Sequence, residues 1–321
     1  MANTKPTCMF LDRLSIDCGD MDFSAIEAAT EFSSFDRSAA NEIVARAQLA
    51  QILITNKVKL GREQFAKLPE LKLVCVIATG TNNIDFTAAA EYGIEVCNVK
   101  DYAAASVSQH VFWFMLTLAG NFLPYQKDIK QGLWQKQDQF CLLSHPIQAL
   151  QGKTLGLVGY GHIARAVERI ALAFDMQVLL AESLSPEHRG SSPDRLPLDE
   201  VLRQSDFISL HCPLTEQSKN LIAEREFALM KNSACIINTA RGGIIHEADL
   251  LQALKYGQIA GAGLDCLMQE PPAADDRLIT ANLPQLIITP HNAWGSLQAR
   301  QKLVDGTAKN IENFLQTHSL A

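Results

Sequence analysis

Three polar residues in the second half of the sequence, Arg241, Glu270 and His291, have side chains that together suit the reduction of a 2-oxo acid. Arginine carries a planar, permanently charged group that pairs with a carboxylate. Histidine gains and loses a proton near neutral pH, and a carboxylate bound to its ring stabilises the charged form. On spacing alone, the same residues also read as a helix-start arginine, a solvated loop carboxylate and a turn histidine.

Each of the three residues follows a short apolar run that is typical of a buried strand. These runs cover residues 234–238, 259–264 and 286–289. In an open parallel sheet, ligands bind beyond the carboxyl ends of the strands, where residues distant in sequence converge. We therefore expect the three side chains to line one crevice.

The segment LGLVGYGHIA, residues 155–164, reads as a strand, a glycine turn and the start of a helix. Gly159 permits a tight turn, Gly161 leaves room for a pyrophosphate, and Ala164 is small enough for close helix–sheet packing. The N-terminus of the helix would offer N–H groups and positive charge to the phosphates. By itself the motif is weak, because glycines also serve ordinary turns.

Glu182 ends the next apolar run, about 20 residues after Gly159, near the distance at which an acidic side chain binds the adenosine ribose. We expect NAD as the cofactor, because this carboxylate would repel the 2′-phosphate of NADP. Arg189 lies a few residues further on and would partly offset that repulsion, so NADP is the less favoured alternative. Glu182 also reads as an ordinary strand-end carboxylate.

Length and composition indicate the class of protein. The 321 residues suit two domains, and 47% hydrophobic with 20% charged residues is typical of a globular protein. A formal charge of -7 is the wrong sign for binding nucleic acid. We expect no membrane partner and no secretion, because no apolar run spans a bilayer and no signal-peptide pattern is present. Eight scattered cysteines favour a reducing, cytoplasmic location.

Short apolar runs alternate with helical patterns, which predicts an α/β fold with parallel sheets. The mostly apolar segment 103–123 is expected to form a helix packed between domains or subunits. A last helix over 296–316 is expected to pack on the first domain or on that interface. The other expected strands cover residues 8–11, 52–54, 73–77, 94–98, 155–158, 178–181 and 207–211. The six strands from residue 155 onward match a full dinucleotide-binding sheet.

Three segments resemble the signature segments of the D-isomer-specific 2-hydroxyacid dehydrogenases: NTARGGIIHEADLLQAL, DCLMQEPP and TPHNAWGS. The stretch VCVIATGTNNIDFTAAAEYGIEVCNVKDYAAASVSQHV is similar to the N-terminal segment of that family. The resemblance spans residue 52 to about residue 296, with the motifs in the family's order. The segment ATGTNNID and the pair Asn56 and Lys57 are most like the glycerate dehydrogenase, or hydroxypyruvate reductase, branch.

The resemblance implies two doubly wound parallel-sheet domains. A Rossmann NAD-binding domain would cover 102–292, and a discontinuous, flavodoxin-like substrate-binding domain would cover 1–101 plus 293–321. It also implies a homodimer built around the long apolar helix. The implied reaction is NADH-dependent reduction of a small 2-oxo acid, hydroxypyruvate or glyoxylate, to D-glycerate or glycolate.

The resemblance also implies a role for each matching residue. His291, paired with Glu270, would deliver a proton to the keto oxygen, and Arg241 would polarise that oxygen. The substrate would contact Arg241, His291 and the backbone N–H groups of Thr79, Gly80 and Thr81. The cofactor would contact Gly159, Gly161, His162, Ile163, Glu182, Cys212, Pro213, Thr239, Ala240, Arg241, Asp265 and His291, with Asp265 holding the carboxamide. No metal is expected, because the histidines outside this site lack ligand spacing.

Several alternatives stay open. Glu182 stands where the family usually has aspartate, which leaves the cofactor preference slightly open. The substrate could be a bulkier branched or aromatic 2-oxo acid, because pocket shape sets that choice. A nucleotide-sensing, corepressor-like binding protein is a further alternative, because such proteins resemble this fold and keep the same three residues. Trp294 would either line the substrate pocket or pack across a dimer interface. Lys57 would lie either near the substrate carboxylate or in solvent.

Overall fold

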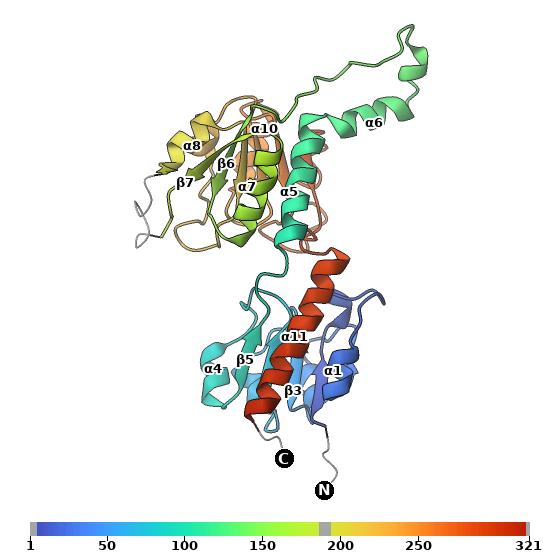
Figure 1. Ribbon diagram of the computed structural model, residues 1–321, viewed down its shortest axis with the longest axis vertical. Coiled ribbons are helices and arrows are strands. Elements are labelled where there is room, and N and C mark those ends of the chain that lie inside the picture. The colour runs from blue at the N-terminus through green and yellow to red at the C-terminus, as the bar shows by residue number, and fades with distance from the viewer. Residues whose placement is uncertain (1–4, 186–193, 319–321) are drawn as a thin grey trace. The chain divides into compact units, whose positions relative to one another are not determined.

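The computed structural model describes residues 5–185 and 194–318. The chain divides into two compact units, each with one parallel sheet covered by helices (Figure 1). Unit 1 comprises Met1–Ala103 and Gly295–Ala321, and unit 2 comprises Ala104–Trp294. Within the described residues, no helix is both long enough and apolar enough to cross a membrane.

The sheet of unit 1 has five parallel strands in the order β2-β1-β3-β4-β5, which is the flavodoxin-like order. Strands β3 and β4 are buried throughout, as expected of inner strands covered on both faces. The elements of the unit are β1 (Thr7–Phe10), η1 (Arg13–Ser15), α1 (Ser24–Ala29), β2 (Glu31–Ser34), α2 (Ile43–Ala47), β3 (Ile52–Thr55), α3 (Arg62–Phe65), β4 (Leu73–Val76), α4 (Phe86–Glu91), β5 (Glu95–Asn98) and α11 (Leu297–Thr317).

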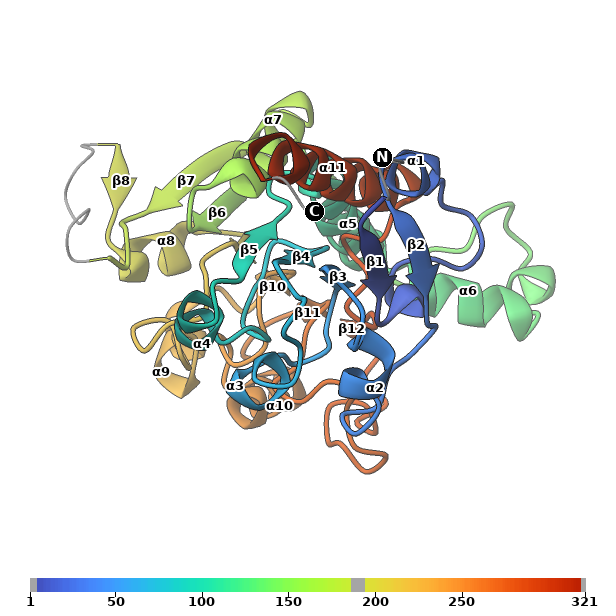
Figure 2. The same cartoon turned by 90° about the horizontal axis from the view of Figure 1, so that it is seen from below.

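The last helix, α11, packs on the sheet of unit 1. It begins after Ser296, whose hydroxyl oxygen accepts a hydrogen bond from the N–H of Ala299 at 3.3 Å. Figure 2 shows α11 and α1 on one face of the sheet and α2 and α3 on the other. Gly306 permits the close approach, because a Cβ there would lie 2.7 Å from Cγ1 of Val99.

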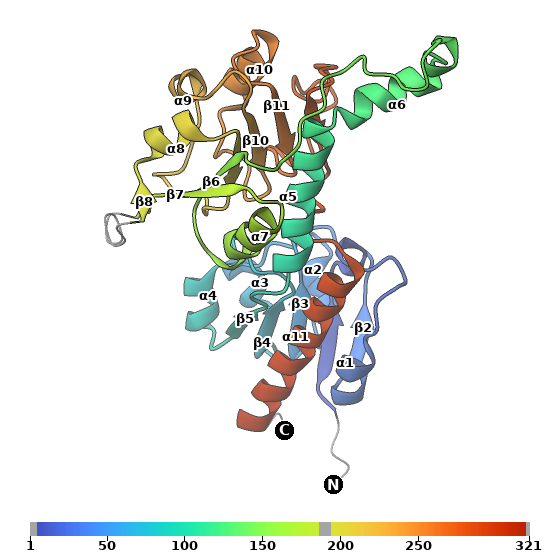
Figure 3. The same cartoon turned by 45° about the horizontal axis from the view of Figure 1, so that its top comes forward.

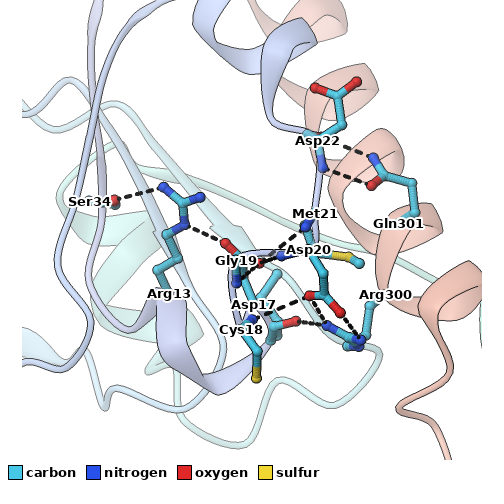
Figure 4. A network of polar contacts seen from close by, with 11 residues as sticks. Arg13, Asp17, Cys18, Gly19, Asp20, Met21, Asp22, Ser34, Arg300 and Gln301 are labelled. Carbon is cyan, nitrogen blue, oxygen red and sulfur yellow. Dashed lines mark hydrogen bonds and ion pairs between the residues drawn. The ribbon is translucent and has the colours of Figure 1, made fainter.

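Arg300, in the first turn of α11, binds the loop that follows η1 (Figure 4). Its two terminal nitrogens each donate to one carboxylate oxygen of Asp20 at 2.7 Å. This bidentate pairing lowers the pKa of Asp20 to about 2. Next to it, the amide group of Gln301 exchanges two hydrogen bonds of 3.0 Å with the backbone of Asp22. These contacts join the last helix to the N-terminal part of the unit.

The sheet of unit 2 has seven parallel strands in the order β12-β11-β10-β9-β6-β7-β8. Helices α5 and α7 cover one face, and α8, α9 and α10 cover the other (Figure 3). The elements are α5 (Ala104–Ala119), α6 (Phe122–Lys130), η2 (Trp134–Lys136), β6 (Thr154–Val158), α7 (His162–Ala173), β7 (Gln177–Ala181), β8 (Arg195–Leu196), α8 (Leu198–Gln204), β9 (Phe207–Leu210), α9 (Glu224–Leu229), β10 (Cys235–Asn238), α10 (Glu247–Lys255), β11 (Gly261–Leu264) and β12 (Leu286–Ile288).

The predicted fold class, two doubly wound parallel α/β units, is confirmed. Every expected strand is present, with small shifts at the ends. Two strands were not predicted from the sequence: β2, a partly exposed edge strand with the sequence EFSS, and β8, which has two residues. The helix expected over 103–123 is α5, which ends at Ala119. The chain then turns at Asn121, whose φ is 48°, and continues as α6.

Candidate active site

The candidate site lies at the carboxyl edge of the unit 2 sheet, on the loops that follow β10, β11 and β12. Glu270 Oε2 and His291 Nδ1 lie 2.7 Å apart, so the carboxylate orients the ring and forms an ion pair with it when it is protonated. The two side chains are 36% and 32% exposed, respectively. An oriented, solvent-accessible imidazole with a carboxylate partner is the arrangement of a general acid or base.

The loop that carries Glu270 is shaped by two carboxylates. Glu270 Oε1 accepts a hydrogen bond from the N–H of Leu267 at 2.9 Å, so this side chain also folds its own loop. Glu247, in the first turn of α10, accepts one from the N–H of Met268 at 2.6 Å. Burial raises the pKa of Glu247. The position of Glu270 therefore depends on one contact within its own loop and on one contact from α10.

His291 itself has a strained backbone. Its φ of 52° lies in the left-handed region, which a non-glycine residue adopts only where the surroundings hold it. The carboxylate of Asp265 does so, accepting the N–H of Asn292 at 2.9 Å and that of Ala293 at 2.8 Å. The indole N–H of Trp294 donates to the carbonyl oxygen of His291 at 2.9 Å. The residues that follow the histidine therefore hold its conformation.

Asp265 is only 2% exposed, and the hydroxyl of Thr289 links it to His110 on helix α5. The hydroxyl of Thr289 donates to Asp265 Oδ1 at 2.5 Å. His110 Nε2 lies 2.9 Å from the same hydroxyl oxygen. Burial lowers the pKa of His110, which keeps its ring neutral. Three hydrogen bonds to Asp265 therefore come from the segment that carries His291.

Arg241 lies on the loop after β10, and its side chain is exposed. Asn238 closes this loop, accepting the N–H of Ala240 at 3.0 Å and donating to the carbonyl oxygen of Arg241 at 2.8 Å. The guanidinium donates to the carbonyl oxygen of Ala240 at 2.7 Å. A Cβ at Gly242 would lie 1.9 Å from the carbonyl oxygen of Leu267. Glycine is therefore required for the Arg241 loop to pack against the Glu270 loop.

The glycine turn after β6 has room for a ligand. Gly159 has a φ of 87°, and a Cβ there would lie 2.7 Å from the backbone nitrogen of Cys212. By contrast, a Cβ at Gly161 would meet nothing within 4 Å. The 12-residue helix α7 begins at the next residue, His162, while Ile163 is half-buried against the core. Open space at the N-terminus of this helix fits a pyrophosphate.

The remaining predicted cofactor residues lie on the same edge of the unit 2 sheet. Glu182 directly follows β7, and its N–H donates to the carbonyl oxygen of Leu196 at 2.8 Å. Pro213 is exposed after β9. The hydroxyl of Thr239 is buried without a hydrogen-bond partner in the described part of the chain, so it is available to a ligand. Arg189 lies outside the described residues.

In unit 1, the predicted substrate loop Thr79–Thr81 follows β4. The hydroxyl of Thr79 donates to the carbonyl oxygen of Val99 at 3.0 Å, and the amide of Asn98 donates to the carbonyl oxygen of Thr79 at 2.7 Å. These bonds anchor the start of the loop to the end of β5. Lys57, whose side chain is exposed, follows β3.

Four residues around the site were not singled out from the sequence: Ser106, His110, Asn238 and Thr289. From the sequence alone, His110 is only a histidine without metal-ligand spacing. No local pattern could have revealed its contact, because His110 and Thr289 are 179 positions apart in the sequence. Among the described residues, no group of three or more His, Cys, Asp and Glu side chains is placed to hold a metal ion.

Comparisons with known proteins show to which family the chain belongs. Residues 112–293 match the family model described as the D-isomer specific 2-hydroxyacid dehydrogenase, NAD binding domain. The glycerate dehydrogenase of Methylorubrum extorquens is 42% identical over 307 residues, which cover 96% of this chain and 95% of the relative. The hydroxypyruvate reductase of Blautia hydrogenotrophica is 36% identical over 310 residues, 95% of this chain and 96% of the relative.

A solved structure shows the same likeness. The D-lactate dehydrogenase of Aquifex aeolicus, complexed with NAD and lactic acid, is 28% identical and superposes with a TM-score of 0.79 over 97% of this chain and 96% of that chain. The sequence, the sheet edge and the comparisons therefore agree on the class of enzyme. The chain belongs to the D-isomer-specific 2-hydroxyacid dehydrogenases, nicotinamide-dependent oxidoreductases that interconvert small 2-oxo and 2-hydroxy acids.

Proposed function

We propose that this dehydrogenase reduces hydroxypyruvate or glyoxylate to D-glycerate or glycolate, with NADH as the cofactor. The observation that carries the proposal is the oriented pair of His291 and Glu270, 2.7 Å apart, on the loops next to that of Arg241. Similarity over nearly the whole chain to a glycerate dehydrogenase and to a hydroxypyruvate reductase supports this choice of substrate.

The side chains divide the chemistry among them. Arg241 binds the substrate carboxylate and polarises the keto oxygen as negative charge develops there. His291, protonated at the start, delivers a proton to that oxygen, and Glu270 stabilises the charged ring beforehand. The backbone N–H groups of Thr79–Thr81 bind the carboxylate as well.

The cofactor proposal is NAD rather than NADP, because Glu182 would accept hydrogen bonds from the ribose hydroxyls and repel a 2′-phosphate. When bound, the reduced nicotinamide supplies the hydride. The open space at Gly161 and the unpartnered hydroxyl of Thr239 support this site. The pyrophosphate would contact Gly159, Gly161, His162 and Ile163, and the nicotinamide and its ribose would contact Cys212, Pro213, Thr239, Ala240, Arg241, Asp265 and His291.

The two parts of the chain have separate roles in this proposal. Residues 102–292 form the dinucleotide-binding domain, which also carries Arg241 and His291, and residues 1–101 with 293–321 form the substrate-binding domain. Eight cysteines that are all free thiols support a cytoplasmic location.

A homodimer is the proposed assembly. On α5 and at the start of α6, four large apolar side chains, Trp113, Leu116, Phe122 and Leu123, are between 45% and 53% exposed. Large apolar side chains exposed on two consecutive helices support the proposal of an interface there. Light scattering on the protein as it elutes from a size-exclusion column would give the mass of the assembly directly. A monomer at micromolar concentration would contradict the proposed dimer.

The deciding experiment follows the absorbance of NADH with the purified protein and a panel of 2-oxo acids. The panel is hydroxypyruvate, glyoxylate, pyruvate and a branched 2-oxo acid, each also tested with NADPH. We expect the highest kcat/KM with NADH and hydroxypyruvate or glyoxylate. A branched acid as the best substrate would contradict the substrate proposal, and a preference for NADPH would contradict the role of Glu182. NADH binding without turnover of any acid would favour the nucleotide-sensing alternative.

A further inference from the structure

Helix α5 contacts the His291 loop on both sides of the catalytic histidine. Its Ser106 hydroxyl donates to the carbonyl oxygen of Ala293 at 2.6 Å. One turn later, His110 Nε2 lies 2.9 Å from the hydroxyl oxygen of Thr289. Ser106 and His110 share one face of the helix because they are four positions apart. The contacts fall two residues before and two residues after His291.

The direction of the hydrogen bonds follows from the chemistry of the groups. A buried carboxylate that accepts two backbone N–H groups acts as an acceptor, so the Thr289 hydroxyl donates its only proton to Asp265 at 2.5 Å. The hydroxyl oxygen must then accept from His110, which places a proton on Nε2. The bonds therefore run in one direction, from His110 through Thr289 to Asp265.

The His110 ring is itself held in place. It meets the rings of Trp113 and Phe114 edge-on, with centroids 4.9 and 4.8 Å away, and its side chain is only 12% exposed. A ring so enclosed has little freedom to turn. Its Nε2–H group is therefore a hydrogen-bond donor in a fixed position. Packing that fixes a donor in this way can hold a strained loop in one conformation.

We propose that His110 is a positioning residue for the proposed proton donor: through Thr289 and Asp265 it holds His291 in its left-handed conformation. The proposal rests on the proposed function for its effect on turnover. The claim that His110 holds the His291 loop does not rest on the proposed function, because the hydrogen bonds that support it involve no substrate or cofactor. Without the His110 donor, the Thr289 hydroxyl is free to turn, Asp265 loses its fixed partner, and the loop samples other conformations.

The first test compares three replacements of the same side chain. His110→Gln places an amide N–H near the position of Nε2, whereas His110→Asn places one nearer to Nδ1, and His110→Leu offers no donor. Hydrogen exchange of the peptide that contains residues 289–294 reports on the loop without any substrate. We expect faster exchange in His110→Leu and His110→Asn and wild-type exchange in His110→Gln. Wild-type exchange in all three variants would overturn the proposal.

Steady-state kinetics provide the second readout. In His110→Leu we expect kcat to fall by up to about 100-fold, because a displaced catalytic group costs that much. The affinity for NADH should change much less than kcat, since the proposed pyrophosphate contacts at the glycine turn are not involved, and His110→Gln should restore most of kcat. Gln109→Ala, an exposed neighbour on the same helix, is the matched control. Faster loop exchange with unchanged kcat would overturn the positioning role.

A double-mutant cycle with Thr289→Val tests whether His110 acts through the hydroxyl of Thr289. If His110 acts through the Thr289 hydroxyl, replacing His110 should change neither exchange nor kcat further once that hydroxyl is gone. Additive effects would overturn the proposed connection. A wild-type enzyme that turns over no 2-oxo acid would count against the proposed function alone, because the exchange measurements still decide whether His110 holds the loop.

Discussion

His291 combines a strained backbone with a charged partner, and both features suit the role of proton donor. A φ of 52° costs free energy that the contacts with Asp265 and Trp294 must offset. The same backbone conformation keeps the ring next to Glu270 before the substrate binds. An oriented donor saves the entropy that a free side chain would lose in the transition state.

Replacing His291 by alanine should therefore abolish most turnover without preventing cofactor binding. We expect kcat to fall by about 100- to 10,000-fold, the usual contribution of a positioned acid or base. Fluorescence titration with NADH should give a dissociation constant close to that of the wild type. His145→Gln, at a histidine bound to Asp128 in the same unit, is the control. Full activity of His291→Ala would refute its assignment.

The cysteines should differ in reactivity according to burial. Cys8, Cys75, Cys212, Cys235 and Cys266 are buried, and burial raises the pKa of Cys8 and Cys235 to about 12 and that of Cys212 to about 11. A thiol reagent at neutral pH should modify the exposed Cys18 first, since only the thiolate reacts. Mass spectrometry of labelled peptides gives the order, and all eight should react in denaturant. Rapid labelling of Cys235 in the native protein would contradict this burial.

At the scale of elements, the turn from β6 into α7 contains two glycines with different physical roles. Gly159 needs its φ of 87° and its close approach to Cys212, so it belongs to the fold. Gly161 has ordinary backbone angles and open space in front of it. A methyl group there disturbs no protein atom but would occupy space proposed for the pyrophosphate.

The two alanine variants should therefore separate stability from binding. Gly159→Ala should lower the free energy of unfolding by roughly 1–3 kcal/mol, from strain and overpacking. Gly161→Ala should leave it unchanged but weaken NADH binding by about 5- to 150-fold, the effect of overpacking a ligand contact. Urea denaturation and fluorescence titration measure the two quantities. Wild-type NADH affinity in Gly161→Ala would mean that the pyrophosphate lies elsewhere.

In the molecule as a whole, histidines that are shielded from water make the free energy of unfolding depend on pH. Loss of hydration lowers the pKa of His211 from 6.5 to about 4, and burial also lowers the pKa of His110. The unfolded chain therefore binds protons at a higher pH than the folded chain does. The stability from the neutral rings is complete above about 6.5 and is lost as the pH falls towards 4.

Urea denaturation at a series of pH values should show this decline, and His211→Gln should make it shallower. Glutamine keeps a polar group near the Ser209 hydroxyl, which lies 2.9 Å from His211 Nε2, but does not titrate. An equally steep decline in His211→Gln would show that other groups cause it.

The class of fold and most of its elements could be predicted from the sequence alone. Alternating apolar runs and helical patterns are local, so the strands around Leu73 and Leu155 and the helix from Leu297 could be predicted from short segments. Strands without an apolar run were missed, because pairing with a neighbour, rather than composition, makes them strands. The edge strand Glu31–Ser34 is the clearest example.

How the proposed catalytic residues are held depends on the packed structure and could not be predicted from local sequence. The sequence indicated that Glu270 and His291 follow neighbouring strands, but the 2.7 Å distance between them depends on loops folded by Leu267 and Asp265. The support from His110 joins residues 179 positions apart. Spacing along the chain carries no information about such contacts, because they form only when the packed sheet brings a helix and a loop together.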